Sequence, residues 1–371
     1  MKGKVLSSQA LLVAVSRSSV TASTIVDGLG YSASLAAATQ WVLKDAPGSV
    51  ATLAVGSRGG QAFDEDPKRW WVLSSALEDM ARLLEILLPL HPGWFLPGAA
   101  LANCVRSGAL VGRQSLVNGT ILRHFALREN LGDIRAKLEA QGRILAIAAL
   151  PIGISLFRWT EGLTTVVDNQ GGEAISPAGL LAAGAVYGSI FLSHNWFCFK
   201  AAQALKFTNL NAFRLTVLAR HFVAQNKVLG VGDVAALEGV YSSRQEQTGQ
   251  IRVGINFKSF SDESDLDLNE VLEIHNREGY LLTLAGKTVL VCIKTEAEDS
   301  DVIQAVLQAQ LLLSKSKSNA MTDPSPNKEE LMRESLEEAT SALESFLERL
   351  RQSGWSTQVV RGAWNTIHCK I

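Results

Sequence analysis

Charge is scarce in this chain, and neither sign of charge is in excess. Of its 371 residues, 19% are charged and 47% are hydrophobic, whereas about a quarter of the residues of an average soluble protein are charged. A membrane association therefore has to be considered. The chain holds 35 Lys and Arg against 36 Asp and Glu, so it lacks the positive excess that attracts a phosphate backbone. We expect no nucleic acid among its partners.

Cysteine is also scarce, and the usual catalytic motifs are missing. The four cysteines lie far apart and form no CxxC pair, so we expect no metal site and no thioredoxin-like redox site. We interpret them as reduced or buried thiols. The sequence contains no GxSxG, P-loop, HExxH or dinucleotide-binding motif, so no catalytic residue can be assigned. The absence of these motifs argues against an enzyme but does not exclude one.

Long runs without charge are the main feature of the N-terminal half. Three candidate membrane segments lie near residues 83–105, 144–158 and 177–199. The first contains Pro89, Pro92 and Pro97, which predict a helix, a turn and a second helix. The second is charge-free for about 21 Å of helix, short of a hydrocarbon core of about 30 Å, and fits a buried or re-entrant helix. The third is long enough to span and is the strongest candidate.

These runs leave two interpretations open. Small residues in GLLAAGAVYGSIFL, within residues 178–192, let helices approach closely, as membrane helix interfaces require. A tightly packed soluble bundle would use the same residues. We favour a membrane-associated helical domain over a soluble core.

A polar strip in residues 122–141, LRHFALRENLGDIRAKLEAQ, stands between the charge-free runs. Asp133, Lys137 and Gln141 follow one another at four-residue spacing, which places them in one row on a helix. A solvated helix face is the simpler interpretation of such a row. The alternative is a functional site in this strip, where Arg128 precedes Asp133 by five residues.

The C-terminal third changes character. Residues 251–260 alternate like a strand, residues 265–276 predict a helix, and residues 280–284 and 288–293 predict a hairpin joined at Gly286. A helix over residues 302–313, a linker over 314–327, a charged helix over 328–352 and a last strand near 356–360 follow. The order predicts a small antiparallel sheet with helices on one face. The expected fold is thus mainly α: a helical domain over residues 1–240 and a small α+β domain over residues 250–371.

Four blocks in a fixed order give the chain a family resemblance. They are WVLKDAPG at residues 41–48, FDEDPKRWW with LEDMARLLEILLP at 63–89, RHFALRENLGDIRAKLEAQ at 123–141, and HNWFCFKAAQALKFTNLNAFR with NKVLGVGDVAALE at 194–238. In this order and spacing the chain resembles the root UVB sensitive family. The chain begins near that family's first helix and departs from its pattern at Ala46 and Asn118, so we expect a shortened and somewhat divergent copy.

The resemblance implies a biological role without an established reaction. Plant members of the family are linked to UV-B response, vitamin B6 homeostasis, auxin transport and plastids, two of them act as partners, and other relatives are described as membrane proteins. Carried over residue by residue, the family motif falls on the following positions: Trp41, Lys44, Asp45, Lys68, Trp70, Asp79, His194 and Asn195. In the third block the resemblance implies a candidate functional polar set of His124, Asn130, Asp133, Lys137 and Gln141. Plastid localisation is implied if the source is a plant or alga.

Two function classes follow. The first is a membrane-bound scaffold or small-molecule or ion conduit that acts with another family member, with no cofactor. The second is a soluble enzyme or sensor for a B6 vitamer, with Lys137 as an amine that could react with pyridoxal phosphate. A Lys beside Asp133 at helical spacing stays protonated, which argues against the second class.

Overall fold

The chain divides into two compact units, and the boundary along the sequence lies between Ala204 and Leu205. The computed structural model describes residues 45–57, 63–88, 94–126, 130–167, 173–240, 249–319, 327–361 and 366–367. We expected the boundary between residues 240 and 250. Residues 205–240 pack with the C-terminal unit instead, because α8 (Ala212–Gln225) contacts α13 (Asp299–Asn319).

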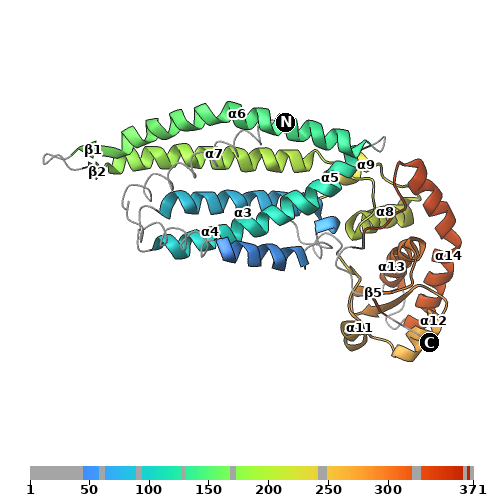
Figure 1. Ribbon diagram of the computed structural model, residues 1–371. Helices are drawn as coiled ribbons and strands as arrows, with labels where there is room; N and C mark the ends of the chain where they lie inside the picture. The colour runs from blue at the N-terminus through green and yellow to red at the C-terminus, as the bar shows by residue number, and fades with distance from the viewer. Residues whose placement is uncertain are drawn as a thin grey trace. The chain divides into compact units, whose positions relative to one another are not determined.

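The first unit is a bundle of long helices. Its neighbouring helices contact one another in the order α6, α7, α3, α4 (Figure 1). After helical residues 45–57, its elements are α3 (Pro67–Leu87), α4 (Phe95–Leu110), the π-helix η3 (Val111–Val117), α5 (Asn118–Phe125), α6 (Leu131–Thr164), β1 (Thr165–Val167), β2 (Glu173–Ile175) and α7 (Pro177–Gln203). Strands β1 and β2 pair in an antiparallel hairpin that connects α6 to α7.

Prolines and caps determine where these helices begin and end. Pro67 and Pro177 begin α3 and α7, where the missing N–H costs no hydrogen bond. The Ser176 side chain accepts a hydrogen bond from the Gly179 amide at 3.2 Å, as an N-cap residue does. Helix α3 ends at Leu87, before Pro89, and α4 begins at Phe95 with Pro97 in its first turn, where a proline is tolerated. The predicted break near residues 83–105 is confirmed.

Helix α6 differs from the prediction for residues 144–158. It runs unbroken through Pro151 for 34 residues, about 51 Å at 1.5 Å per residue. The charge-free run is therefore the middle of a long helix and neither a short buried helix nor a re-entrant one. Ile144 is 66% exposed and Ile147 is 74% exposed, so its apolar side chains are not covered by this unit.

One helix among the described residues is apolar and long enough to cross a membrane. It covers Leu131–Leu163, with a mean hydropathy of 1.6 over its most apolar stretch, of which 11% is buried. Helix α7, which contains the candidate over residues 177–199, does not meet the same criterion. By this criterion of length and composition, the helix over Leu131–Leu163 is the candidate for a membrane crossing among the described residues.

The second unit surrounds a large apolar core. Its elements are α8, α9 (Val231–Leu237), β3 (Ile251–Val253), α11 (Phe257–Glu263), α12 (Leu268–Ile274), β4 (Tyr280–Ala285), β5 (Thr288–Lys294), α13, α14 (Lys328–Gln352) and β6 (Thr366–Ile367). Helix α13 contacts α8, α14 and strands β3, β4 and β5. Its turns from residue 302 to 313 are buried on every side, and the buried glutamines among them, Gln304, Gln308 and Gln310, form hydrogen bonds to neighbouring elements.

The sheet of this unit is mixed, with strand order β3-β5-β4 and β6 beside β5. Strands β4 and β5 form the predicted antiparallel hairpin, and Gly286 takes a positive φ of 60° in its turn. Strands β3 and β6 lie parallel to β5, so the predicted all-antiparallel sheet is wrong. The predicted linker is also shorter at its start, because α13 continues to Asn319. Residues 320–326 lie outside the described residues.

A buried histidine connects the helices and the sheet of the second unit. His275 is fully buried, its Nδ1 lies 3.1 Å from the Val271 carbonyl oxygen, and its Nε2 lies 3.3 Å from Gln308 Oε1. Tyr280 donates its hydroxyl to the same Gln308 oxygen at 2.7 Å. Burial lowers the pKa of His275 to about 4, because a protonated imidazole in the interior has lost its contacts with water.

We expect acid to destabilise the second unit through His275. Between the unfolded pKa of about 6.5 and the folded value, the unfolded chain binds the proton and the folded chain does not, so stability falls as the pH falls. The shift corresponds to a loss of about 3 kcal/mol between about pH 7 and pH 4. Urea unfolding of the full chain at a series of pH values measures this slope. His275→Gln should flatten it, whereas the control His221→Gln should leave it unchanged, and equal slopes for His275→Gln and wild type would contradict the assignment.

Candidate functional site

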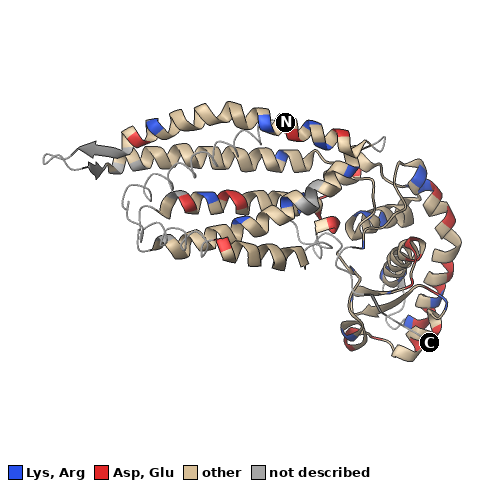
Figure 2. Cartoon of the chain, in the orientation of Figure 1, with Lys and Arg blue, Asp and Glu red and all other residues tan. Residues whose placement is uncertain are grey.

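Helix α3 carries a row of charges into the interior of the first unit. Glu78, Asp79, Arg82 and Glu85 are exposed by only 1%, 0%, 4% and 4%. Their spacing of three and four residues places them on one side of the helix, and Figure 2 shows the red and blue segments of α3 between tan neighbours. Ionised groups this deeply buried require partners, because leaving water costs several kcal/mol for each ion.

Asp79 is the centre of this network. Its Oδ1 accepts a hydrogen bond from Arg82 Nη1 at 3.1 Å, and its Oδ2 accepts one from Asn195 Nδ2 at 3.1 Å. His194 Nδ1 is also bonded to Oδ2. Asp79 and Arg82 belong to α3, whereas His194 and Asn195 belong to α7. The carboxylate therefore joins two helices that are far apart in the sequence.

Glu78 and Glu85 extend the network toward η3 and α4. Glu78 pairs with Arg82 on its own helix and with Arg113 of η3, whose Nη2 lies 2.7 Å from Glu78 Oε2. Glu85 Oε2 lies 3.5 Å from Arg106 Nη1, in α4. Each carboxylate faces a guanidinium group, the pairing that best satisfies buried carboxylates.

A chain of hydrogen bonds leads from Arg106 to the surface. Arg106 Nη2 donates to Asn103 Oδ1 at 2.8 Å, and Asn103 Nδ2 donates to Asp45 Oδ1 at 3.2 Å. Asp45 is exposed at the start of the described residues. The charged interior is thus connected to the helix over residues 45–57.

Cys198 lies next to the imidazole of His194, one turn further along α7. Its Sγ is 3.5 Å from His194 Nε2, and both residues are fully buried. Since Nδ1 faces the Asp79 carboxylate, Nδ1 carries the proton in neutral His194, and Nε2 is an acceptor toward the thiol. Three reactive groups therefore follow one another in the order carboxylate, imidazole, thiol.

The polar row predicted on residues 133–141 lies elsewhere, on the surface of α6. Lys137 Nζ pairs with Asp133 Oδ2 at 2.8 Å, with the two side chains 71% and 53% exposed. Gln141 is exposed on the same helix. The row forms as predicted, and its geometry is that of a solvated helix face.

The other predicted residues are distributed over several elements. His124 lies in the last turn of α5 and meets the Phe125 ring edge to face. The Asn130 carbonyl accepts a hydrogen bond from the Ile134 amide at the start of α6. Trp70 meets Phe63 edge to face, and Lys68 is buried at the start of α3. Trp41 and Lys44 lie outside the described residues. Of the family motif positions, the structure brings Asp79, His194 and Asn195 together.

Most of the residues around Asp79 are not among the candidate site residues predicted from the sequence. These are Glu78, Arg82, Glu85, Asn103, Arg106, Arg113 and Cys198. Glu78, Arg82 and Glu85 at spacings of four and three are a signal of one charged helix face. Such a face is usually solvated, so the sequence alone does not predict that it is buried.

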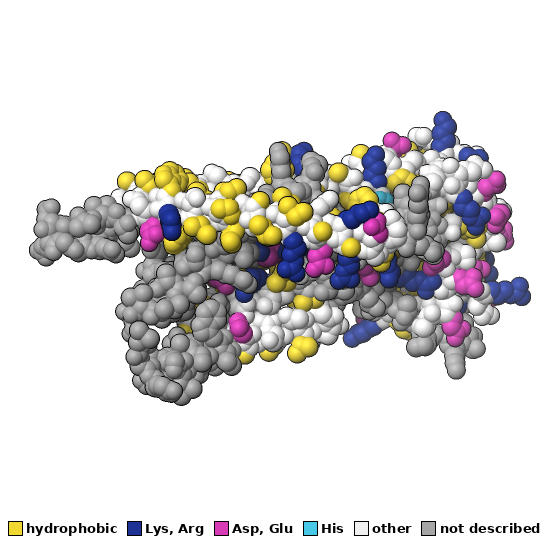
Figure 3. Space-filling view, turned by 45° about the horizontal axis from the view of Figure 1, so that its top comes forward, with side chains coloured by type: hydrophobic (Ala, Val, Ile, Leu, Met, Phe, Trp, Pro, Cys, Tyr) yellow, Lys and Arg dark blue, Asp and Glu magenta, His cyan; other side chains and the backbone are white. Residues whose placement is uncertain are grey.

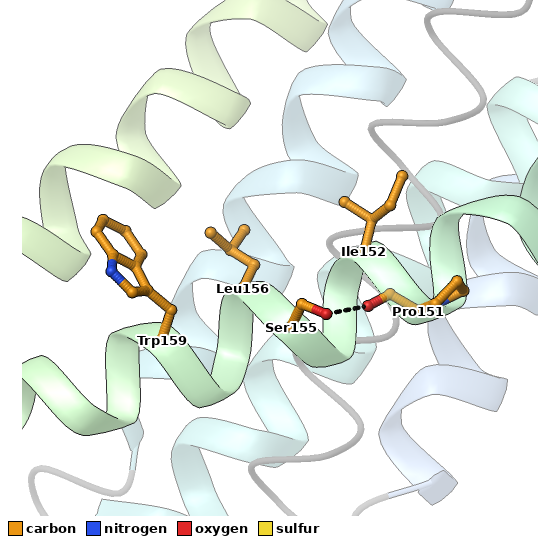
Figure 4. A pocket seen from close by; sticks show the side chains of 5 residues that line it. All are labelled: Pro151, Ile152, Ser155, Leu156 and Trp159. Atoms are coloured by element: carbon orange, nitrogen blue, oxygen red, sulfur yellow. Dashed lines mark hydrogen bonds between the residues drawn. The ribbon is translucent and has the colours of Figure 1, made fainter.

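A shallow groove of about 490 Å³ lies on α6 and is lined by Pro151, Ile152, Ser155, Leu156 and Trp159 (Figure 4). Ile152 and Trp159 are 58% and 54% exposed, and Ser155 Oγ donates to the Pro151 carbonyl at 2.8 Å. The hydroxyl is thereby occupied, and the groove presents an apolar surface. No group of three or more His, Cys, Asp or Glu residues in the described part of the chain could hold a metal ion.

We expect removal of the Asp79 carboxylate to destabilise the first unit strongly. Asp79→Ala leaves Arg82 and His194 buried with fewer partners, at a cost of about 3–5 kcal/mol. Asp133→Ala removes a carboxylate that also pairs at helical spacing but is exposed, which costs less than about 1 kcal/mol. Thermal unfolding of the full chain in mild detergent, followed by tryptophan fluorescence, compares the two. Similar shifts in the two variants would contradict a central role for Asp79.

Comparison with known proteins covers nearly the whole chain. Residues 3–226 match the family described as "Vitamin B6 photo-protection and homoeostasis domain". Residues 227–366 match "Root UVB sensitive protein, C-terminal". No solved structure matches the chain.

Several relatives come from Arabidopsis thaliana. Protein root UVB sensitive 5 is 27% identical over 87% of this chain, which spans 62% of that protein's length. Protein root UVB sensitive 3 is 24% identical over 95% of this chain and 74% of its own length. Protein root UVB sensitive 2, chloroplastic, is 24% identical over 95% of this chain and 73% of its own length. With both domains matched, the chain belongs to the root UVB sensitive family.

Proposed function

We propose that the first unit is embedded in a membrane and forms a scaffold or conduit with a charged interior, acting in vitamin B6 homeostasis. One observation carries this proposal. The polarity of the first unit is reversed relative to a soluble protein, since its interior holds charged groups and its surface holds large apolar side chains. The second unit has the ordinary polarity.

The exposed apolar side chains support a lipid-facing surface. Among the described residues, all the exposed large hydrophobics except Leu237 and Phe257 belong to the first unit. On α7 they include Leu181 at 77% and Leu192 at 68% exposure. Figure 3 shows hydrophobic side chains gathered along this unit. A contiguous exposed apolar surface on a soluble monomer is uncommon and marks a membrane or protein contact.

Helix α6 fits a membrane crossing in length as well as in composition. Arg143 and Arg158 bracket its apolar middle, which covers about 21 Å. Long basic side chains at both ends can extend toward the headgroups and lengthen the span. The β1–β2 hairpin then returns the chain into α7, which packs beside α6.

The charged interior supports a role in holding or passing a small polar molecule or ion. Ionisable residues inside a membrane bundle are costly and mark functional pathways when they face inward. Asp79, Arg82 and His194 face inward here and are paired across helices. In this proposal the network is the polar feature of the unit, and the exposed Asp133–Lys137 row lies in water or at the headgroups.

The biological setting is proposed from the family. The description of the first domain names vitamin B6, and one relative is named chloroplastic. We propose that the protein acts in vitamin B6 homeostasis or UV-B response, with auxin transport as a further setting, and that another family member is its partner. In a plant or alga we propose a plastid membrane as its location.

A soluble enzyme or sensor of B6 vitamers is the second candidate, and the geometry favours it less. Its proposed amine, Lys137, is exposed and paired with Asp133. Activated lysine nucleophiles are desolvated or held near another cation. Lys137 is neither desolvated nor next to another cation, so its surroundings do not favour a Schiff base with pyridoxal phosphate.

We expect the protein to resist extraction from membranes by alkaline carbonate and by high salt. Ile147→Glu places a charge on the apolar middle of α6, which costs roughly 2–3 kcal/mol at the centre of a bilayer. The membrane-bound fraction should therefore fall. Gln141→Glu, on the exposed polar part of the same helix, is the matched control and should leave that fraction unchanged. Release of the wild type by carbonate would contradict the proposal.

A further inference from the structure

Cys198 adds a thiol to the charged network that the proposed scaffold or conduit contains, since it lies beside His194, which is bonded to Asp79. We propose that Cys198 is an activated thiol, with His194 as its base and Asp79 as the group that orients the base, and that it adds reversibly to the carbonyl carbon of a small neutral aldehyde. The choice of an aldehyde rests on the proposed role in vitamin B6 homeostasis. The activation of the thiol rests on geometry alone.

The geometry assigns a role to each of the three residues. Nδ1 of His194 is bonded to Asp79 Oδ2, and Nε2 lies 3.5 Å from Cys198 Sγ. A nucleophile within reach of a base, with the base oriented by a third group, is the general signature of nucleophilic catalysis. Helical spacing of four residues keeps the thiol and the imidazole on one face of α7.

The orienting group is itself fixed. Asp79 Oδ1 is held by Arg82 and its Oδ2 also accepts from Asn195, each at 3.1 Å. With both oxygens occupied, the carboxylate cannot turn away from His194 without breaking these bonds. The imidazole therefore keeps the tautomer that presents Nε2 to the thiol.

The proposed step balances without an oxidant or a reductant. The thiol proton first passes from Sγ to Nε2 of His194, which leaves a thiolate beside an imidazolium. As the sulfur–carbon bond forms, the carbonyl π electrons move to oxygen. The imidazolium, stabilised by Asp79, then gives its proton to that oxygen. The product is a hemithioacetal, and the reverse steps release the aldehyde and restore the thiol.

The surroundings restrict the partner to a small neutral molecule. Asp79, His194 and Cys198 have no exposed surface, so a partner reaches the thiol only when the packing of α7 opens locally. Glu78 and Arg82 are already paired with one another, so an added charge would enter without a counter-ion and would be disfavoured. A neutral aldehyde vitamer such as pyridoxal satisfies both conditions.

The chain supplies a matched control for the thiol. Cys292 is also fully buried, but its Sγ donates to the Ile255 carbonyl at 3.3 Å. A carbonyl oxygen accepts a hydrogen bond without acting as a base of useful strength. If burial alone governed reactivity, the two cysteines would react alike.

The first experiment measures thiol activation with methyl methanethiosulfonate, a small neutral reagent, on the full chain in mild detergent. Mass spectrometry follows each cysteine separately. We expect Cys198 to react at least roughly tenfold faster than Cys292 near pH 7, and its rate to change little between about pH 6 and pH 8, whereas an unassisted thiol gains about tenfold per pH unit below about 8.5. His194→Gln should remove the advantage. A wild-type Cys198 rate equal to that of Cys292, or one that rises tenfold per pH unit, would overturn the activation even if the variant does not fold.

The second experiment tests the aldehyde. Pyridoxal should slow the labelling of Cys198, whereas pyridoxine, which carries an alcohol in place of the aldehyde, should not. Equal protection by both compounds, or protection by neither, would overturn the covalent step. The carbonate extraction of the wild type is independent of Cys198, so failure here leaves the proposed membrane role standing, and failure of the extraction test leaves the thiol activation standing.

Discussion

The pairing of buried charges around Asp79 is the constraint on which the first unit depends. Asp79 lies on α3 and two of its three donors lie on α7, so the relative position of these helices is set by hydrogen-bonding distances as well as by packing. Arg82 then has to satisfy both Asp79 and Glu78, and Glu78 in turn draws Arg113 of η3 inward. A buried ion pair contributes little net stability, but losing one partner is costly. The network therefore determines how α3, η3 and α7 are arranged, and it contributes little to the free energy of unfolding.

The second unit is organised by a different force. Strands β4 and β5 are buried along almost their whole length, and α13 is buried on all sides from residue 302 to 313. Burial of that much apolar surface is the dominant favourable term in folding. Among its buried polar groups, His275 and Tyr280 both contact Gln308. The chain thus joins a unit specified by charge to a unit stabilised by apolar burial, and most of the exposed large apolar side chains among the described residues belong to the first.

Local features of the fold could be predicted from the sequence because they depend on neighbouring residues. Gly286 acts within its own turn, and the hairpin over residues 280–293 follows from alternation around this glycine. The parallel pairing of β3 and β6 with β5 depends on contacts between distant segments, which no local pattern reveals. The same distinction explains α6. Its charge-free run is visible in the sequence, but its continuity through Pro151 and its exposure are tertiary properties.

The candidate site could be predicted only in part, for a related reason. Asp133, Lys137 and Gln141 form a conspicuous row because their spacing is local, and that row is exposed. Asp79 and His194 are 115 positions apart and meet only in the folded chain. A charged residue in an apolar helix indicates a buried site when its partner can be identified. The partner of Asp79 lies on α7, which contains the longest charge-free run of the sequence. His194 and Asn195 fall within the charge-free run of α7, because neither histidine nor asparagine is one of the four residue types that define charge in a sequence, yet both side chains reach the Asp79 carboxylate. This explains how α7 can be uncharged in sequence and still complete a charged interior.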